Sequence, residues 1–250
     1  MRSDLYSNLY QTEDTHWWHK AKRIIVTSLI RAHAPTNNPV ILDVGCGTGK
    51  NLEEFKSLGR VVGIDLSQTA VDYCKKRGIN SVVRGSVEKL PFSANKIDIV
   101  TALDVIEHVD EQKSLSEVAR VLKPGGVLIC TVPAFTWLWS EWDVALHHKK
   151  RYTSSETISV IEKNGMKVVR WTYLYSFLVV PVFFIRNIKK IFRNKSQEYT
   201  SDFNLNNPII NSVLFLLARL EHLIITMYHI PFGTSVLCVA KKTTIPKSAS

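Results

Sequence analysis

The sequence has 250 residues, of which 45% are hydrophobic and 22% are charged. This composition is that of a globular chain with a substantial core, and it excludes a low-complexity or intrinsically disordered protein. Lysine and arginine outnumber aspartate and glutamate by 32 to 22, and the net charge of +10 indicates an anionic partner such as a nucleic acid, a membrane surface or a phosphorylated substrate.

The N-terminal residues and the cysteines bear on the compartment. Residues 1–18 lack the apolar core of a signal peptide, so we expect a cytoplasmic protein. The four cysteines are widely spaced and none forms a C-x-x-C pair, which argues against a disulfide framework and a zinc site. We interpret them as small buried residues in a reducing compartment.

Residues 1–16 are polar and predict a turn-rich arm, and Thr15 is a candidate N-cap for a helix over residues 17–34. The string HWWHKAKR in this helix suits a lid over a cofactor, with an aromatic wall and cations for a carboxylate. The alternative is a helix packed on the sheet edge with its cations in water. The residues concerned are Trp17, Trp18, Lys22 and Arg23.

The stretch Val40–Gly49 reads VILDVGCGTG and organises the chain. A buried strand enters a glycine turn and then a helical pattern, which is the first half of a βαβ nucleotide-binding unit. The G-x-G-x-G spacing differs from the G-x-G-x-x-G of pyrophosphate binders, and the Asp43 carboxylate would repel a phosphate but attract a cation. Asp65 ends the next predicted strand, 60–65, at the distance from the turn where an acid takes ribose hydroxyls.

Together with RGSVEKLPF, IDIVTALDVIEHV, ARVLKPGGVLICTVP and GTSVLCVAKK, this stretch resembles the class I S-adenosylmethionine-dependent methyltransferases over most of the chain. The resemblance implies an α/β fold with a doubly wound, mostly parallel seven-stranded sheet, and S-adenosyl-L-methionine as the cofactor. It also implies an adenine contact at Ser86, where similar enzymes usually have aspartate, so this contact is expected to be weaker or differently placed. The residues expected to bind the donor are Asp43, Gly45, Cys46, Gly47, Gly49, Asp65, Leu66, Ser86, Val87 and Leu103.

Further strands are predicted over residues 80–84 and 97–103, and a helix over 112–122 that ends in KPGG before the strand VLICTVP. The segment DVIEHVD follows the 97–103 strand at the edge where a doubly wound sheet presents its carboxyl ends to ligand. Glu107 and His108 are therefore candidates for the reaction site, with His108 as a general base. The alternative is a helix start in which both serve as cap and solvent contacts.

Residues 133–153, PAFTWLWSEWDVALHHKKRYT, follow the fifth strand and suit a substrate wall. The pattern W-S-x-x-D…H-x-x-R-Y resembles a subgroup of bacterial and archaeal methyltransferases often linked to glycan or lipid-carrier pathways. The alternative is a loop with core tryptophans and a solvated basic run. A metal site from Asp143, His147 and His148 lacks a visible fourth ligand, so no metal is expected. The predicted catalytic residues are His148, His108 and Asp143, and the predicted substrate contacts are Trp139, Arg151 and Tyr152.

A helix is predicted over 154–164 and strands over 166–173 and 234–241, which leaves an insertion before the last strand. The insertion holds an apolar run at 173–185 that is too short to span a bilayer, then a basic run, then an amphipathic helix near 208–229. This pattern suits either a segment in an anionic membrane interface or a helical hairpin that covers the sheet edge. The expected regions are 1–38 (arm and lid helix), 39–174 (donor-binding core), 175–231 (insertion) and 232–250 (last strand and a disordered tail).

These features predict a methyltransferase that acts on an oxygen of a small, glycosylated or lipid-linked acceptor, since a histidine could remove the hydroxyl proton. A nucleic-acid methyltransferase is the first alternative, supported by the charge. It is disfavoured because no nucleic-acid module and no N/D-P-P-Y/F motif follow the fourth strand. A non-catalytic donor-binding protein is the second alternative, made less attractive by the polar 143–152 loop.

Overall fold

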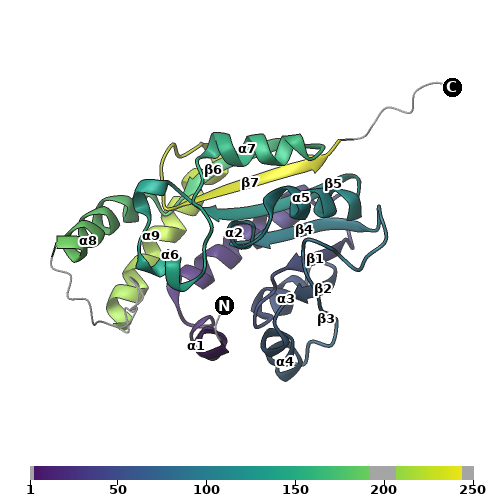
Figure 1. Ribbon diagram of the computed structural model, residues 1–250, viewed down its shortest axis with the longest axis horizontal. Helices are drawn as coiled ribbons and strands as arrows, with labels where there is room; N and C mark the ends of the chain where they lie inside the picture. The colour runs from purple at the N-terminus through teal and green to yellow at the C-terminus, as the bar shows by residue number, and fades with distance from the viewer. Residues whose placement is uncertain (1–2, 192–206, 244–250) are drawn as a thin grey trace.

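A seven-stranded sheet forms the centre of the fold, in a computed structural model that describes residues 3–191 and 207–243. The strand order is β3-β2-β1-β4-β5-β7-β6, with β7 antiparallel to both of its neighbours and the remaining pairs parallel. This order confirms the predicted doubly wound sheet (Figure 1). The strands are β1 (Val40–Val44), β2 (Arg60–Asp65), β3 (Val82–Arg84), β4 (Ile97–Leu103), β5 (Leu122–Pro133), β6 (Met166–Leu174) and β7 (Ser235–Lys242).

Near-continuous apolar runs make the central strands, because helices cover both of their faces. One hydrophobic cluster joins Ile41 and Ile99 to helices α2 (Trp17–His33), α3 (Lys50–Phe55) and α4 (Gln68–Lys76). A second cluster joins Leu42 and Val100 to α5 (Glu111–Val121) and α7 (Ser154–Lys163) on the opposite face. Successive residues of one strand therefore pack against the helices on opposite faces of the sheet. The carboxyl ends of β1, β4 and β5 lie next to one another at one edge of the sheet.

Two expected boundaries differ in the structure. The KPGG segment lies inside β5 and not in a turn before it, because the β4–β5 register shifts between Ile97 and Ile99 and accommodates the extra residues as a bulge. The cap of α2 is His16 and not Thr15, since the His16 ring accepts from the Trp18 N–H.

The first residues form a helix, α1 (Ser3–Thr12), where a turn-rich arm was expected. The helix is fixed by tertiary contacts: the Tyr6 side chain is buried, and the Tyr10 ring packs at a tilt against Tyr73 of α4, with 4.7 Å between centroids. The expectation of an arm gave weight to the polar residues and overlooked an apolar pair that repeats after four positions, Leu5–Tyr6 and Leu9–Tyr10.

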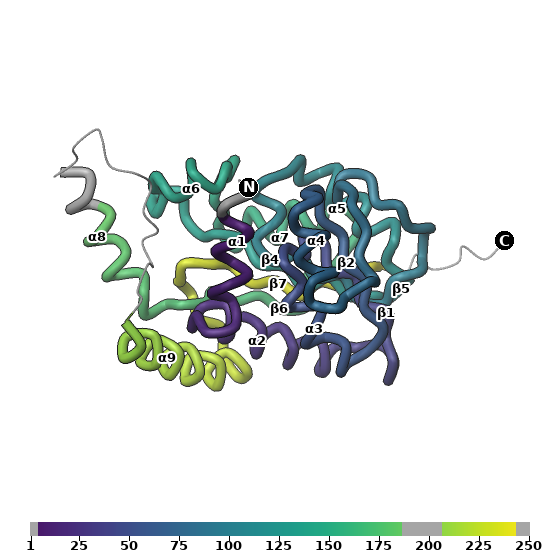
Figure 2. Tube along the Cα trace, turned by 90° about the horizontal axis from the view of Figure 1, so that it is seen from below, coloured from purple at the N-terminus to yellow at the C-terminus, as the bar shows by residue number. Residues whose placement is uncertain are grey.

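The insertion contains two helices, α8 (Val179–Ile191) and α9 (Pro208–Met227). In both views they lie at the same end of the molecule, and α9 runs alongside α2 (Figures 1 and 2). Three short 3₁₀ turns, Ile106–His108, Thr136–Leu138 and Ser176–Leu178, and the short helix α6 (Glu141–Ala145) complete the described elements. The predicted basic run extends into residues 192–195 and the predicted disordered tail into 244–250, both outside the described residues.

All four cysteines are buried and free, which confirms their interpretation as small core residues. Cys130 and Cys238 face each other across the β5–β7 pair.

Candidate active site

The glycine turn after β1 has the backbone conformation that only glycine adopts freely. Gly45, Gly47 and Gly49 have φ of 65°, 55° and 86°. A Cβ at Gly45 would lie 2.5 Å from Val105 Cγ2, and one at Gly49 would lie 2.8 Å from Cys74 Sγ. Close packing against protein atoms thus adds to the conformational reason for these two glycines.

Asp43 and Asp65 lie at the carboxyl ends of β1 and β2, beside this turn. Asp43 Oδ1 accepts from Thr101 Oγ1 at 2.5 Å, whereas Asp43 Oδ2 is buried and makes no hydrogen bond of the usual geometry. Burial raises the pKa of Asp43 to about 7. Asp65 accepts from the Gly47 and Ser67 N–H groups at 3.0 and 2.9 Å, so it also braces the turn.

Helix α1 covers the glycine turn. The Tyr6 hydroxyl donates to Asp65 at 3.4 Å, and Leu9 Cδ2 lies 3.5 Å from the position of a Cβ at Gly47. The chain after α1 is anchored by Glu13, a buried carboxylate that accepts from Thr48 Oγ1 and, at 2.6 Å, from Arg77 Nη2. The predicted arm therefore forms part of the site.

The residues predicted near the adenine lie in the turn after β3. Ser86 Oγ accepts from the Glu88 N–H at 3.1 Å and so shapes this turn, while Val87 is buried. Leu66, directly after Asp65, is 68% exposed, and Leu103 is half-buried at the end of β4. No contact among them tests their predicted roles, which stay predictions.

Asp104 links the end of β4 to the predicted lid helix. It has a positive φ of 56°, and its carboxylate accepts from Thr131 Oγ1 at 2.9 Å and pairs with Lys22 Nζ. Burial opposes ionisation, but the Lys22 ammonium outweighs it and holds the pKa of Asp104 below its usual range. Of the lid cations, Lys22 therefore reaches the site, whereas Arg23 bonds Glu54 and the Glu13 carbonyl.

Asp143, His148 and Arg151 come together as one buried group. His148 Nδ1 lies 2.8 Å from Asp143 Oδ1, and Arg151 donates to the two Asp143 oxygens at 2.8 and 3.1 Å. Burial opposes ionisation of Asp143, but His148 and Arg151 outweigh it and hold its pKa well below the usual range. An ionised carboxylate only accepts hydrogen bonds, so His148 Nδ1 carries the proton in this contact.

The free side of His148 faces Glu107 and His108. His148 Nε2 lies 4.0 Å from Glu107 Oε1, and the His108 and His148 rings pack edge to face at 4.8 Å. The backbone holds the two segments together, because the Lys149 N–H donates to the Glu107 carbonyl at 2.7 Å. The sequence predicted His108 and His148 as separate candidates, and the structure brings them into contact.

Glu107 is fully buried, and neither of its carboxylate oxygens makes a hydrogen bond. Burial, together with Asp104, raises the pKa of Glu107 well above its usual value, and burial lowers the pKa of His108 to about 4. Donor atoms of Glu107, His108 and His148 lie within 4.8 Å of one another. At neutral pH the group thus includes an acid that keeps its proton and the uncharged imidazole of His108.

The remaining predicted acceptor residues have partners inside the protein. Arg151 is buried and also donates to the Ala134 carbonyl at 3.0 Å, and the buried Tyr152 donates to Glu111 Oε2 at 2.8 Å. Trp139 is half-buried. The pairing of Lys22 with Asp104 was missed by sequence reasoning, and the only signal for it was that Asp104 directly follows a predicted strand.

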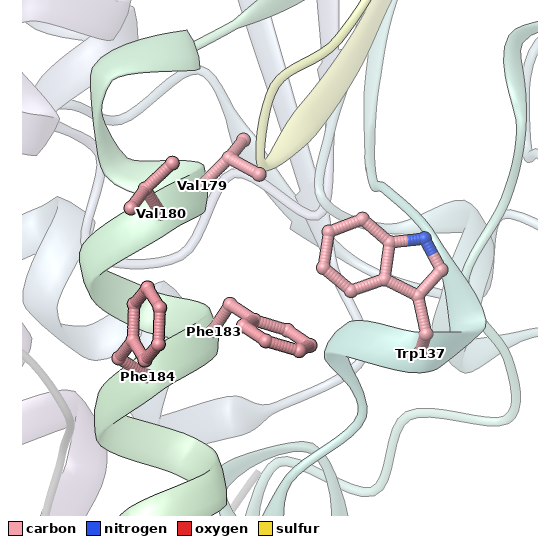
Figure 3. Close-up of a pocket in the computed structure, with 5 residues that line it drawn as sticks. All are labelled: Trp137, Val179, Val180, Phe183 and Phe184. Atoms are coloured by element: carbon pink, nitrogen blue, oxygen red, sulfur yellow. The ribbon is translucent and has the colours of Figure 1, made fainter.

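A neighbouring tryptophan, Trp137, lines an apolar hollow of about 320 Å³ with four residues of α8 (Figure 3). Figure 3 shows Phe183 pointing from α8 toward the Trp137 indole, and their ring centroids are 5.8 Å apart. The same helix carries Arg186, which is buried and close enough to Arg151 to help lower the pKa of that guanidinium, although burial is the larger cause. Helix α8 thus carries both residues that line the hollow and a cation close to Arg151. The lining residues of the hollow are Trp137, Val179, Val180, Phe183 and Phe184.

The residues beside the glycine turn fit a cationic nucleoside donor. The buried oxygen Asp43 Oδ2 makes no hydrogen bond of the usual geometry and can face a positive charge, and the positive-φ glycines place a backbone without side chains next to it. Asp65 offers carboxylate oxygens for ribose hydroxyls once the long Tyr6 contact yields. These protein groups therefore suit S-adenosyl-L-methionine as the bound donor.

Comparison with known proteins agrees with this geometry. Residues 42–130 match the family described as "Methyltransferase domain". A probable S-adenosylmethionine-dependent methyltransferase of Mycolicibacterium smegmatis is 28% identical over 62% of this chain and 61% of its own length. A ubiquinone biosynthesis O-methyltransferase of Bartonella tribocorum is 33% identical over 54% of this chain and 63% of its own length.

The fold likeness extends over almost the whole chain. The crystal structure of a putative sarcosine dimethylglycine methyltransferase from Galdieria sulphuraria covers 96% of this chain and 98% of its own, with a TM-score of 0.63 at 17% identity. Among curated relatives, the chain spans 50%, 61% and 38% of the length of three that it matches. The chain is thus similar, through the methyltransferase domain matched at residues 42–130, to proteins named as S-adenosylmethionine-dependent methyltransferases.

Proposed function

We propose that this chain transfers a methyl group from S-adenosyl-L-methionine to a hydroxyl oxygen of an acceptor, with His148 as the general base. The observation that carries the proposal is the hydrogen bond between His148 Nδ1 and the ionised Asp143. This bond fixes the tautomer in which Nε2 can accept a proton. When bound, the donor supplies a methyl group that its sulfonium already activates, so the protein must align the acceptor and remove one proton.

The chain's own residues divide these tasks. Arg151 holds Asp143 in place with a two-point contact, and Asp143 orients His148 and stabilises the imidazolium that forms. Glu107 keeps its proton and lies beside His148 Nε2, so it can donate a hydrogen bond to the acceptor oxygen. Lys22 and Asp104 close the side of the site toward α2, and their ion pair helps to exclude water.

An acceptor with an apolar chain fits the surroundings of this site best. The hollow at Trp137 is lined by apolar side chains, and α8 joins it to the Arg151 region. A relative's name, ubiquinone biosynthesis O-methyltransferase, describes methylation of an oxygen on a lipid-like molecule. We therefore infer a lipid-linked or otherwise hydrophobic acceptor, and the sequence resemblance to glycan and lipid-carrier methyltransferases supports the same class.

The test is incubation of the purified chain with S-adenosylmethionine labelled in its methyl group and total cell extract, followed by separation into lipid, nucleic acid, protein and small molecules. We expect base-stable label in the lipid fraction with the wild-type chain and its loss with His148→Gln. A matched control is His147→Asn, because His147 is exposed, lies next to His148 and has a positive φ that asparagine tolerates.

Two results would contradict the proposal. Label in RNA or DNA would identify a nucleic-acid methyltransferase, which the net charge of +10 keeps as the main alternative. Donor binding by calorimetry with no label in any fraction would indicate a protein that binds the donor without transferring its methyl group.

A further inference from the structure

Helix α9 lacks the polar outward face expected of a surface helix in water. Its inward face carries Asn211 and Glu221 together with buried apolar residues, and its outward face carries apolar side chains. Asn211 accepts from the Trp17 N–H at 2.8 Å, and the buried Glu221 accepts from the N–H and hydroxyl of Ser176 at 2.7 and 2.6 Å. The polar residues of α9 thus anchor it to the protein.

The outward face forms one continuous apolar surface, called here the outer arc. At 100° per residue its members fall within about 140° of the helix circumference. The helix has 20 residues, so the arc is about 30 Å long. Each member is between 38% and 76% exposed, and no polar side chain of α9, which is described in full, falls inside the arc. The members are Ile209, Ile210, Val213, Leu216, Leu217, Leu220, Leu223, Ile224 and Met227.

A surface of this extent on an isolated protein marks a contact with an apolar partner. By length and composition, α9 is also the one helix among the described residues that could cross a bilayer. Because its polar face is bonded to α2 and to the turn at Ser176, the helix cannot be surrounded by lipid on all sides. The arrangement suits a helix that lies in the plane of a membrane with only one face in lipid.

Charge favours a membrane over a second copy of the chain. Two copies would each bring a net charge of +10, whereas anionic headgroups attract that charge. Arg219 is exposed directly beside the arc, where it lines a hollow of about 360 Å³ with Phe215, Leu216, Leu220 and Leu223. A cation next to an apolar hollow matches a lipid phosphate above its acyl chain.

A second exposed apolar surface lies on α8 at the same end of the molecule (Figures 1 and 2). Val180, Phe183, Phe184 and Ile185 are each between 42% and 63% exposed. Three of these residues also line the hollow at Trp137. The exposed apolar surface of α8 is thus continuous with the hollow at Trp137.

We propose that the outer arc of α9 docks on an anionic lipid bilayer, with Arg219 at the headgroups. This inference concerns where the chain works and does not depend on the acceptor or on methyl transfer.

The experiment is flotation of the full chain with vesicles, without donor or acceptor. We expect binding to phosphatidylcholine vesicles that contain phosphatidylglycerol, weaker binding to pure phosphatidylcholine, and release at high salt. The double variant Leu216→Glu/Leu220→Glu should lower partitioning by about tenfold or more, because it places two charges in the arc. Arg219→Ala should lower binding to anionic vesicles by about fivefold.

Thr226→Glu is the matched control, since Thr226 is exposed on α9 but lies outside the arc, and it should bind nearly as well as wild type. Circular dichroism and thermal unfolding check that each variant folds. Equal binding by the double variant and wild type would overturn the proposal. So would a wild-type chain that ignores vesicles and elutes as a dimer that Leu216→Glu/Leu220→Glu dissociates, because a second copy would then cover the arc.

Discussion

His148 Nδ1 lies 2.8 Å from Asp143 Oδ1, in a region where the Asp143 side chain is fully buried. The pair resembles the orienting carboxylate and imidazole of hydrolytic enzymes, and in the proposed reaction the acid would set the tautomer and the ring would take the proton.

Replacing Asp143 by asparagine should lower kcat by about 100-fold or more, because the amide can hold His148 in the wrong tautomer. Donor affinity should stay within about twofold, since Asp143 does not face the glycine turn. Turnover with labelled donor and calorimetric donor titration together check this. A large loss of donor affinity with unchanged kcat would place Asp143 in donor binding instead.

Replacing Arg151 by alanine should lower the free energy of unfolding by about 3 kcal/mol, because it leaves the buried Asp143 carboxylate without its cation. The remaining hydrogen bond from His148 should then hold the Asp143 pKa less strongly below its usual range. Chemical denaturation at neutral pH measures the first effect. The second is measured from the pH dependence of kcat, whose acid limb should move to higher pH. Lys113→Ala on the surface of α5 is the control, and it should cost less than about 1 kcal/mol, because the Lys113 side chain is 68% exposed.

Donor binding should depend on the protonation of Asp43, whose pKa is about 7. Below that pH the carboxyl group is neutral and cannot attract the sulfonium, so affinity should weaken by up to about tenfold per unit as pH falls. Above it the carboxylate is ionised and affinity should level off. Calorimetry across pH 5 to 9 tests this.

The same titration with S-adenosylhomocysteine, which lacks the sulfonium charge, should show a weaker pH dependence, and Asp43→Asn should remove the Asp43 contribution. An unchanged slope in Asp43→Asn would assign the titration to another group.

Helix α1 should retain the donor by covering the glycine turn. Glu13→Ala removes the acceptor for Thr48 and Arg77, so the segment should loosen and the donor should dissociate about tenfold faster. Asp14→Ala is the matched control, because Asp14 is a neighbouring acid whose side chain is 46% exposed. Stopped-flow displacement of bound donor measures both rates, and equal rates would show that α1 does not gate release.

Chelation of divalent metal ions should leave turnover within about twofold of the untreated chain. The reason is that Glu107 retains its proton at neutral pH and is then a poor ligand, even though donor atoms of Glu107, His108 and His148 lie within 4.8 Å. Turnover before and after chelator and dialysis checks this. Loss that a specific divalent ion restores would reassign the three side chains to metal binding.

Much of the core followed from the sequence because local pattern and tertiary role agree there. Strand β4 has the predicted bounds, and β1 and β2 continue into the glycine turn and Asp65 as expected. Helix α1 did not follow, because its stability comes from Tyr6 and Glu13 contacts with residues far along the chain. The outward side of α9 did not follow either, because periodicity gives two faces without saying which one meets the protein.

At the site, the sequence identified Asp143, His148 and His108 as reactive types but could not place them relative to one another. Their contact depends on the backbone bond between Lys149 and Glu107, which joins two segments that are far apart in sequence. Arg151 was expected to face the acceptor, and its two bonds to Asp143 are visible only in three dimensions.

The contact between Gly45 and Val105 has a consequence for donor binding. Val105 directly precedes the 3₁₀ turn that holds Glu107 and His108, and there is no room for even a methyl group between it and the glycine turn. If the glycine turn moves when the donor enters, Val105 must therefore move with it, together with the segment that carries Glu107 and His108.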